Sequence, residues 1–374
     1  MQFNRFLKSH IDTDLKERMA FIGGPRQVGK TTLGKEFLKS PESYFSWDDL
    51  SDREIIKKHQ FDVNLKVILL DEIHKYVRWR TLVKGLYDKR GKDLRIIVTG
   101  SARLDHFSKG GDSLFGRYHY YRMHPLSLNE LNKNPSPSDL LQLMKYGGFP
   151  EPFIKQNDTF LRRWQRERQA RVMQEDLRDI VNLKEYSSID LLNTMLPERV
   201  GSLLSKTSIA EDLEKSPHTI EAWLQALESV YSCYRISPMG APKVKALKKQ
   251  QKLYLWDWTS VENVGAKFEN LVASHLLKYC HYLTDVLGHS TELRYLRDVN
   301  GHEVDFVVLK DKQPIFAVEC KTGERSLSSS IEYFLARTKI PKFYQVHMGS
   351  KDYGNAKSGR VLPFTNFCKE EKLV

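Results

Sequence analysis

Short apolar runs alternate with longer amphipathic stretches over the first part of the chain. The runs at residues 20–22, 67–70 and 96–98 have the length of strands, and the stretches at residues 32–40 and 79–90 have the length of helices. Alternation of this kind indicates a parallel sheet, because each crossover between parallel strands needs room for a helix. We therefore predict an α/β domain at the N-terminus.

The pattern changes after residue 126. Two charge-rich helices are expected over residues 161–177 and 189–204, followed by two short helices and two strands that flank a lysine-rich loop. From residue 261 onward a helix precedes several strands. The chain is therefore expected to continue from the sheet domain into a helical connector and then into two further domains.

Composition and charge narrow the class of protein. The chain has 374 residues, of which 40% are hydrophobic and 28% charged, and these values are typical of a globular protein with two to three domains. A net charge of +12 suits a polyanionic partner. No apolar run approaches the roughly 20 residues that span a bilayer, so no membrane partner is expected. The N-terminus lacks the layout of a signal peptide, so we expect a cytoplasmic protein, and the four scattered cysteines suggest neither a zinc site nor disulfides.

The P-loop pattern G-x-x-x-x-G-K-[ST] lies between the first expected strand and a helix that begins near Thr32. In such a loop, backbone N–H groups converge on phosphate oxygens at a helix N-terminus. Lys30 is expected to reach the β and γ phosphates, and Thr31 to ligate Mg²⁺. ATP and Mg²⁺ are thus the expected cofactors, and the contacting residues are Gly24, Pro25, Arg26, Gln27, Val28, Gly29, Lys30, Thr31 and Thr32.

Two later strands end in residues suited to the same site. The apolar run at residues 67–70 is followed by Asp71 and Glu72, which we expect to hold Mg²⁺ and to activate the attacking water, respectively. The next strand ends in Thr99-Gly100-Ser101, where Thr99 or Ser101 either senses the γ phosphate or belongs to an ordinary turn. Arg117 is either an arginine finger that acts on a neighbouring copy, which requires a homo-oligomer, or a surface arginine.

A winged-helix domain is predicted next. Ser208 to Glu211 has the spacing of a capping box, Ser216-Pro217 starts a second helix, and the loop that follows carries many lysines. The loop either contacts nucleic acid phosphates or is a solvated hairpin. The carboxylates of the second helix, Glu221 and Glu228, are expected to be exposed and to weaken base reading. The lysines of the loop are Lys243, Lys245, Lys248, Lys249 and Lys252.

Charged residues with a regular order stand in the last third of the chain. Glu269 lies on an amphipathic helix whose apolar face includes Phe268, Leu271, Val272 and Leu276. Asn300-Gly301 predicts a hairpin turn, after which Asp305 begins an apolar strand. The next strand ends in Glu319-Cys320-Lys321, and strand alternation puts Glu319 and Lys321 on one face.

Two family resemblances follow from these residues. The motifs of the sheet domain resemble a prokaryotic family of AAA+ type ATP-binding proteins with an uncharacterised C-terminal domain. That resemblance also rests on Gly147-Gly148-Phe149-Pro150-Glu151, Gly265 to Asn270 and Glu303 to Phe306, so it covers nearly the whole chain. The helical glutamate, strand aspartate and Glu-x-Lys resemble the PD-(D/E)XK restriction-endonuclease superfamily.

The second resemblance implies a metal site. Asp305 and Glu319 would bind Mg²⁺ or Mn²⁺, Lys321 would position the attacking water or stabilise charge, and Glu269 would complete the outer metal shell, with Glu303 as a spare ligand. The expected domains are a P-loop ATPase domain over residues 1–130, a helical connector over 131–204, a winged-helix domain over 205–258 and a nuclease-like domain over 259–374.

Two functions from different classes are compatible with these residues. The first is an Mg²⁺-dependent ATPase whose ATP turnover regulates the binding or the cleavage of nucleic acid, with DNA favoured over RNA. The catalytic residues expected for this function are Lys30, Glu72, Arg117, Glu269, Asp305, Glu319 and Lys321. The second is an ATP-dependent switch whose nuclease-like domain is inactive and binds a protein partner. The presence of Glu269, Asp305, Glu319 and Lys321 favours the enzyme, and the acidic second helix of the winged-helix domain favours the switch.

Overall fold

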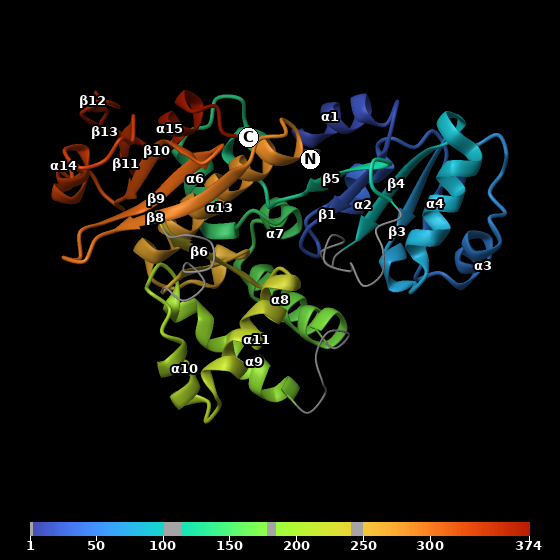
Figure 1. Ribbon diagram of the computed structural model, residues 1–374, viewed down its shortest axis with the longest axis horizontal. Coiled ribbons are helices and arrows are strands. Elements are labelled where there is room, and N and C mark those ends of the chain that lie inside the picture. The colour runs from blue at the N-terminus through green and yellow to red at the C-terminus, as the bar shows by residue number, and fades with distance from the viewer. Residues whose placement is uncertain (1–2, 101–113, 178–184, 241–249) are drawn as a thin grey trace. The chain divides into compact units, whose positions relative to one another are not determined.

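The computed structural model describes residues 3–100, 114–177, 185–240 and 250–374 (Figure 1). The chain divides into two compact units, Gln2–His124 and Pro125–Val374. Each unit contains its own sheet. No helix within the described ranges is long and apolar enough to cross a membrane.

The N-terminal unit is built on a five-stranded sheet of order β2-β3-β4-β1-β5, in which every neighbouring pair is parallel. This arrangement confirms the α/β prediction. All residues of β1 and β3 are buried, as expected for a parallel sheet covered on both faces. The strands are β1 (Met19–Gly23), β2 (Tyr44–Ser46), β3 (Val67–Asp71), β4 (Arg95–Gly100) and β5 (Tyr118–Arg122), and the α-helices are α1 (Leu7–Asp14), α2 (Lys30–Lys35), α3 (Leu50–Lys58) and α4 (Trp79–Arg90).

Strand register brings the ends of three strands to one edge of this sheet. β4 lies between β3 and β1, with Thr99 paired to Asp71 on one side and to Ile22 on the other. Because all three strands run in the same direction, their carboxyl ends lie at the same edge. The loop that follows β1 and the carboxylates of Asp71 and Glu72 at the end of β3 therefore lie at this edge.

The second unit begins with a series of helices. Its helices before the second sheet are α5 (Leu128–Leu131), α6 (Pro137–Tyr146), α7 (Pro150–Lys155), α8 (Asp158–Arg171), a π-helix (Val172–Leu177), α9 (Tyr186–Met195), α10 (Lys206–Asp212) and α11 (Pro217–Ser229). Gly148 permits close packing at the start of α7, because a Cβ there would lie 2.6 Å from Trp258 and 2.8 Å from the carbonyl oxygen of Leu126. This close approach explains the second glycine of the Gly147-Gly148 pair.

The expected start of α10 was wrong by three residues. The cap is Ser205, whose side chain accepts the N–H of Ser208, so Ser208 lies in the first turn. The start of α11 agrees with the prediction, since Ser216 caps it and Pro217 occupies its first position. Two strands follow, β6 (Cys233–Pro238) and β7 (Lys252–Leu255), which pair antiparallel.

The sheet of the second unit has eight strands and is mixed, with the order β12-β13-β11-β10-β9-β8-β6-β7. Strands β8, β9 and β10 are successive antiparallel neighbours, which confirms the hairpin at Asn300-Gly301, and β11 then pairs parallel to β10. Helix α13 (Val264–Asp285) precedes these strands, and its predicted apolar face is fully buried. The remaining elements are β8 (Thr291–Arg297), β9 (Glu303–Lys310), β10 (Gln313–Cys320), α14 (Ser329–Leu335), β11 (Phe343–His347), β12 (Tyr353–Asn355), β13 (Gly359–Pro363) and α15 (Phe364–Glu370).

Candidate functional site

The loop after β1 has a backbone shape that its glycines permit. Gly29 has a φ of 99°, and a Cβ at Gly24 would lie 2.3 Å from the carbonyl oxygen of Met123. Neither position tolerates an ordinary side chain without strain. The Lys30 ammonium is buried and donates to the carbonyl oxygens of Gly24 at 2.9 Å and Pro25 at 2.8 Å. The loop thus wraps around the ammonium group.

Asp71 accepts hydrogen bonds from three hydroxyl groups. The Oδ2 atom accepts from Thr31 Oγ1 at 3.0 Å and from the Tyr44 hydroxyl at 3.0 Å, and Oδ1 accepts from Thr99 Oγ1. Burial, followed by the charge of Asp71, raises the pKa of Tyr44 to about 12. Sequence reasoning missed Tyr44, because no motif marks the first residue of β2 as a neighbour of β3.

Glu72 follows Asp71 with a φ of 55°, in the left-handed region that non-glycine residues rarely adopt. Burial raises the pKa of its carboxyl group, and the positive charge of Lys30 opposes that shift. Its Oε2 atom lies 3.6 Å from His74 Nε2 and 3.9 Å from Lys75 Nζ. Glu72 therefore lies within the electrostatic reach of the P-loop lysine, and its role in activating water stays a prediction.

Two other predicted residues of this site occupy more ordinary positions. Thr99 is fully buried against Asp71, so its hydroxyl orients the carboxylate. Ser101 lies outside the described residues. Arg117 is partly buried and donates to Asp88 through Nε to Oδ1 at 2.7 Å and through Nη2 to Oδ2 at 3.2 Å. Its role as a finger stays a prediction.

These residues fit a nucleotide with Mg²⁺. The Thr31 hydroxyl and the Asp71 carboxylate are hard oxygen ligands that lie within 3.0 Å of each other. The loop offers a lysine, and its glycine at position 24 lies so close to the Met123 backbone that no larger residue would fit there. The donor set and the loop shape agree with the chemistry expected from the sequence.

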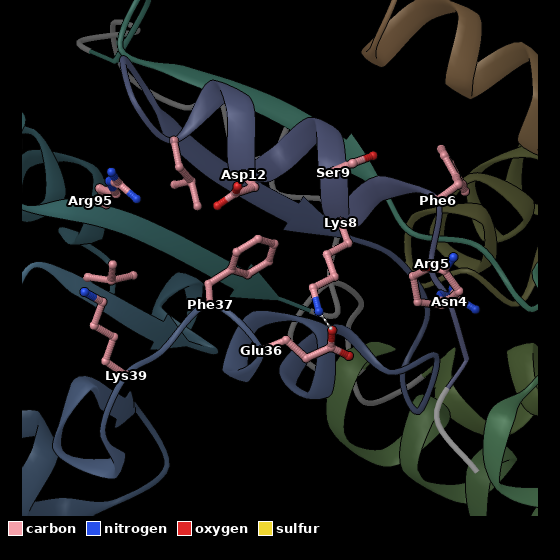
Figure 2. Close-up of a pocket in the computed structure, with 12 residues that line it drawn as sticks. Asn4, Arg5, Phe6, Lys8, Ser9, Asp12, Glu36, Phe37, Lys39 and Arg95 are labelled. Atoms are coloured by element: carbon pink, nitrogen blue, oxygen red, sulfur yellow. Dashed lines mark ion pairs between the residues drawn. The ribbon is translucent and has the colours of Figure 1, made fainter.

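A pocket of about 600 Å³ in the same unit lies elsewhere (Figure 2). It is lined by α1, by the segment after α2, and by Val67 and Arg95, which begin β3 and β4. The starts of these strands form the edge opposite to Asp71 and Thr99. The pocket contains none of the predicted site residues. Lys8 and Glu36 form an ion pair of 2.6 Å within it, as Figure 2 shows.

The C-terminal candidates also come together. Val318 of β10 pairs with Phe306 of β9, so Glu319 follows opposite Asp305 on the neighbouring strand. The N–H of Cys320 donates to Asp305 Oδ2 at 2.9 Å. Lys321 Nζ donates to Glu319 Oε1 at 2.7 Å, which agrees with their predicted shared face.

A lysine that was expected on the surface joins this group. Lys252 was expected to belong to the exposed basic loop, but it lies in β7 with a side chain only 2% exposed. Its Nζ atom is 3.2 Å from Glu269, 2.7 Å from Glu303 and 3.1 Å from Asp305. The other four lysines of the loop lie outside the described residues.

The lysine changes the chemistry of the group, which we call the carboxylate cluster: Glu269, Glu303, Asp305 and Glu319. Burial and then the charge of Asp305 raise the pKa of Glu269 and of Glu319. Burial by itself lowers the pKa of Lys252, but the neighbouring carboxylates raise it overall. No group of three or more acidic, histidine or cysteine side chains in the described ranges is arranged to hold a metal ion. In this arrangement the cluster does not fit a divalent ion.

The carboxylates on the predicted second helix of the winged-helix domain are also less exposed than expected. Glu221 and Glu228 were expected to be exposed, but both are partly buried against Arg235 of β6. The shortest contacts are 2.9 Å in each pair, and Lys206 adds a further contact of 2.9 Å to Glu221. The carboxylates are therefore compensated within the protein.

One comparison with known families concerns the N-terminal domain. Residues 16–132 match the family described as an AAA domain. This part of the chain is therefore an AAA-type domain of the P-loop ATPase class. Residues 137–261 and 264–367 match two families described as domains of unknown function, DUF8612 and DUF4143.

Several curated relatives are similar over a large part of the chain. An uncharacterised protein of Mycobacterium tuberculosis is 24% identical over 242 residues, which cover 64% of this chain and 54% of the relative. A protein of Methanocaldococcus jannaschii is 24% identical, with 89% and 81% covered, and one of Haemophilus influenzae is 25% identical, with 71% and 75% covered. The chain thus spans about half the length of the mycobacterial relatives that it matches.

Solved structures give weaker likenesses. The ORC1 protein of Aeropyrum pernix in complex with DNA matches with a TM-score of 0.34 and 14% identity, over 71% of this chain and 91% of that chain. The clamp loader delta protein of Bacillus subtilis matches with a TM-score of 0.30 and 10% identity, over 59% and 87%. Likenesses at this level say nothing about what this chain binds.

Proposed function

We propose that the protein is a Mg²⁺-dependent ATP hydrolase. The observation that carries the proposal is the convergence of Lys30, Thr31, Asp71 and Glu72 at one edge of the parallel sheet, with Thr31 Oγ1 3.0 Å from Asp71 Oδ2. The match to an AAA domain supports the same conclusion. Since this convergence combines phosphate-binding and water-activating groups, hydrolysis is favoured over simple nucleotide binding.

Each residue has a distinct part in the reaction. Thr31 and Asp71 would hold Mg²⁺, and Tyr44 and Thr99 fix the orientation of Asp71 through their hydrogen bonds. Lys30 would bind the β and γ phosphates, and Glu72 would orient the attacking water and accept its proton. Mg²⁺ at this position would supply neutralisation of charge on the phosphate oxygens.

Phosphate release from ATP by the purified protein tests these roles. Lys30→Ala removes nucleotide binding together with turnover, whereas Glu72→Gln keeps binding and lowers turnover by about 10²-fold or more. Exposed Glu54, which pairs with Lys57 and Lys58, provides the control Glu54→Gln with unchanged turnover. Wild-type turnover in Glu72→Gln would remove the water-activating role.

A second candidate function is cleavage of phosphodiesters by the C-terminal unit. The convergence of Glu269, Asp305, Glu319 and Lys321 supports it, as does the succession of α13, three antiparallel strands and a parallel strand. The position of Lys252 opposes a metal ion in this arrangement of the cluster. Incubation of supercoiled DNA with the protein and Mn²⁺, with and without ATP, tests this candidate.

The partner of the ATPase is proposed from charge. The net charge of +12 and the basic loop support DNA as the partner, bound through phosphates rather than bases. A protein partner is the alternative, and it is favoured if the C-terminal unit does not cleave. Oligomer formation is tested by the dependence of specific activity on protein concentration, in wild type and in Arg117→Ala.

A further inference from the structure

Lys252 is the buried cation at the centre of three carboxylates. Its ammonium group lies within 3.2 Å of carboxylate oxygens from three residues, Glu303 and Asp305 on β9 and Glu269 on α13. Taking an ammonium group out of water is costly unless carboxylates surround it, and here three do. The same three carboxylates would repel one another without the lysine.

The backbone fixes β7, and with it Lys252, in this position. The N–H of Gly201 donates to the carbonyl oxygen of Leu253 at 3.2 Å, and the N–H of Leu204 donates to that of Gln251 at 2.8 Å. Two residues beyond Lys252 on the same strand, the Tyr254 hydroxyl donates to Glu269 Oε1 at 2.8 Å. The lysine is thus held by its strand and is not a surface side chain that has folded inward.

One carboxyl oxygen of the cluster has no partner among the described residues. The four carboxyl groups face three cationic side chains within the described contacts, Lys252, Lys321 and Arg297, the last of which lies 2.8 Å from Glu303. The Glu319 side chain is only 8% exposed, and its buried Oε2 atom has no hydrogen-bond partner in the part of the chain that the structure describes. A buried carboxyl oxygen without a partner is rare in native structures, and this one is the position beside Asp305 that a divalent ion would use if Lys252 were withdrawn.

A divalent ion bound to Asp305 and Glu319 would share the Asp305 carboxylate with Lys252. An ion bound to Asp305 and Glu319 would lie close to the Lys252 ammonium, which is itself 3.1 Å from Asp305. Repulsion between like charges inside a protein is strong because little water screens it. Occupation by one cation therefore excludes the other.

We propose that Lys252 is the resident cation of the carboxylate cluster and closes it to divalent metal ions, so that a metal site forms only when this lysine is withdrawn. If the C-terminal unit cleaves phosphodiesters, Lys252 would regulate that cleavage, and this consequence rests on the second candidate function. The exclusion of metal ions by Lys252 does not depend on whether the unit is a catalyst.

Binding of Mn²⁺ to the full-length, nucleotide-free protein tests the proposal. The variant Lys252→Met keeps the length of the side chain and removes its charge. We expect it to bind Mn²⁺ at least about tenfold more tightly than wild type in a calorimetric titration, and to gain thermal stability with rising Mn²⁺ while wild type does not. The double variant Lys252→Met with Asp305→Asn should lose this binding. Lys310→Met, on β9 outside the cluster, should behave like wild type.

Each outcome decides the matter. Wild type that binds Mn²⁺ as tightly as Lys252→Met, through Asp305, overturns the proposal, and so does a folded Lys252→Met variant that binds no Mn²⁺. If Lys252→Met folds only in Mn²⁺, the proposal is supported, and if it stays unfolded at every Mn²⁺ concentration, the proposal is overturned. DNA cleavage is measured separately, so a variant that binds Mn²⁺ and cleaves nothing removes the second candidate function alone.

Discussion

Asp71 is preorganised by its neighbours before any ligand reaches it. A carboxylate with 6% exposure needs donors, and Thr31, Tyr44 and Thr99 each provide a hydroxyl. The donors come from three different elements, α2, β2 and β4, so the carboxylate also joins these elements together. Its orientation is therefore a property of the fold as well as of the site.

Removal of one donor should cost stability. We expect Tyr44→Phe to lower the free energy of unfolding of the nucleotide-free protein by about 1 to 2 kcal/mol, because a buried charged acceptor loses a partner. Tyr87→Phe is the matched control, since its hydroxyl donates at 3.0 Å to the exposed carbonyl oxygen of Glu17, which water can satisfy instead. Urea denaturation measures both changes. Equal losses in the two variants would show that Asp71 does not depend on Tyr44.

The residues that sequence reasoning found differ from those it missed in one respect. Lys30, Thr31 and Asp71 belong to local patterns, a loop motif and an acidic residue at the end of an apolar strand. Tyr44 and Lys252 belong to no pattern, because their importance arises from contacts with Asp71 and Asp305, which lie 27 and 53 residues away. Such contacts depend on strand order, which the sequence does not state.

At the scale of elements, α13 anchors the start of the second unit. The Leu128 N–H, at the start of α5, donates to His275 Nε2 at 3.1 Å, and His275 Nδ1 donates to the Leu271 carbonyl oxygen at 2.8 Å. Both ring nitrogens are thus engaged only when the imidazole is neutral. Burial lowers the pKa of His275 to about 4.

This histidine should make stability depend on pH. Its folded pKa of about 4 is below the ordinary value of 6.5, so the unfolded chain binds the proton more tightly, and stability is lost as pH falls below 6.5 until about 4. The expected contribution is roughly 2 kcal/mol between pH 7.5 and pH 5. Denaturation at both pH values should show a smaller loss in His275→Gln than in wild type, and exposed His218→Gln should match wild type. An identical loss in His275→Gln would contradict the assignment.

Elements were predicted most securely where the local pattern was strong. The parallel sheet, α4 and the hairpin at Asn300-Gly301 follow from apolar runs and a turn pair, and the structure has them. The start of α10 was missed because Ser205 and Ser208 both suit a cap, and only the backbone decides between them. Compensation of Glu221 and Glu228 by Arg235 could not be seen either, because it joins α11 to a strand.

The net charge of +12 is a property of the whole chain and does not identify the lysines that contact a polyanion. Lys252 is excluded because its charge is already used by the carboxylate cluster. Lys245, Lys248 and Lys249 lie outside the described residues and stay the predicted contacts. Two triple lysine variants that lower the net charge equally, one in this loop and one elsewhere, separate direct phosphate binding by the loop from the long-range attraction due to net charge.

Replacement of Lys245, Lys248 and Lys249 by alanine should reduce the salt dependence of DNA binding. Removing one lysine–phosphate interaction lowers the slope of log affinity against log salt by about 0.9 on duplex DNA, so three such interactions correspond to about 2.7. Fluorescence titration at several salt concentrations measures the slope. The control replaces Lys57, Lys58 and Lys89, three exposed lysines of the N-terminal unit, and lowers the net charge by the same amount. Because long-range attraction follows net charge whereas counterion release follows direct phosphate binding, only the first set should flatten the slope. Equal slopes in the two triple variants would move the nucleic acid interface away from this loop.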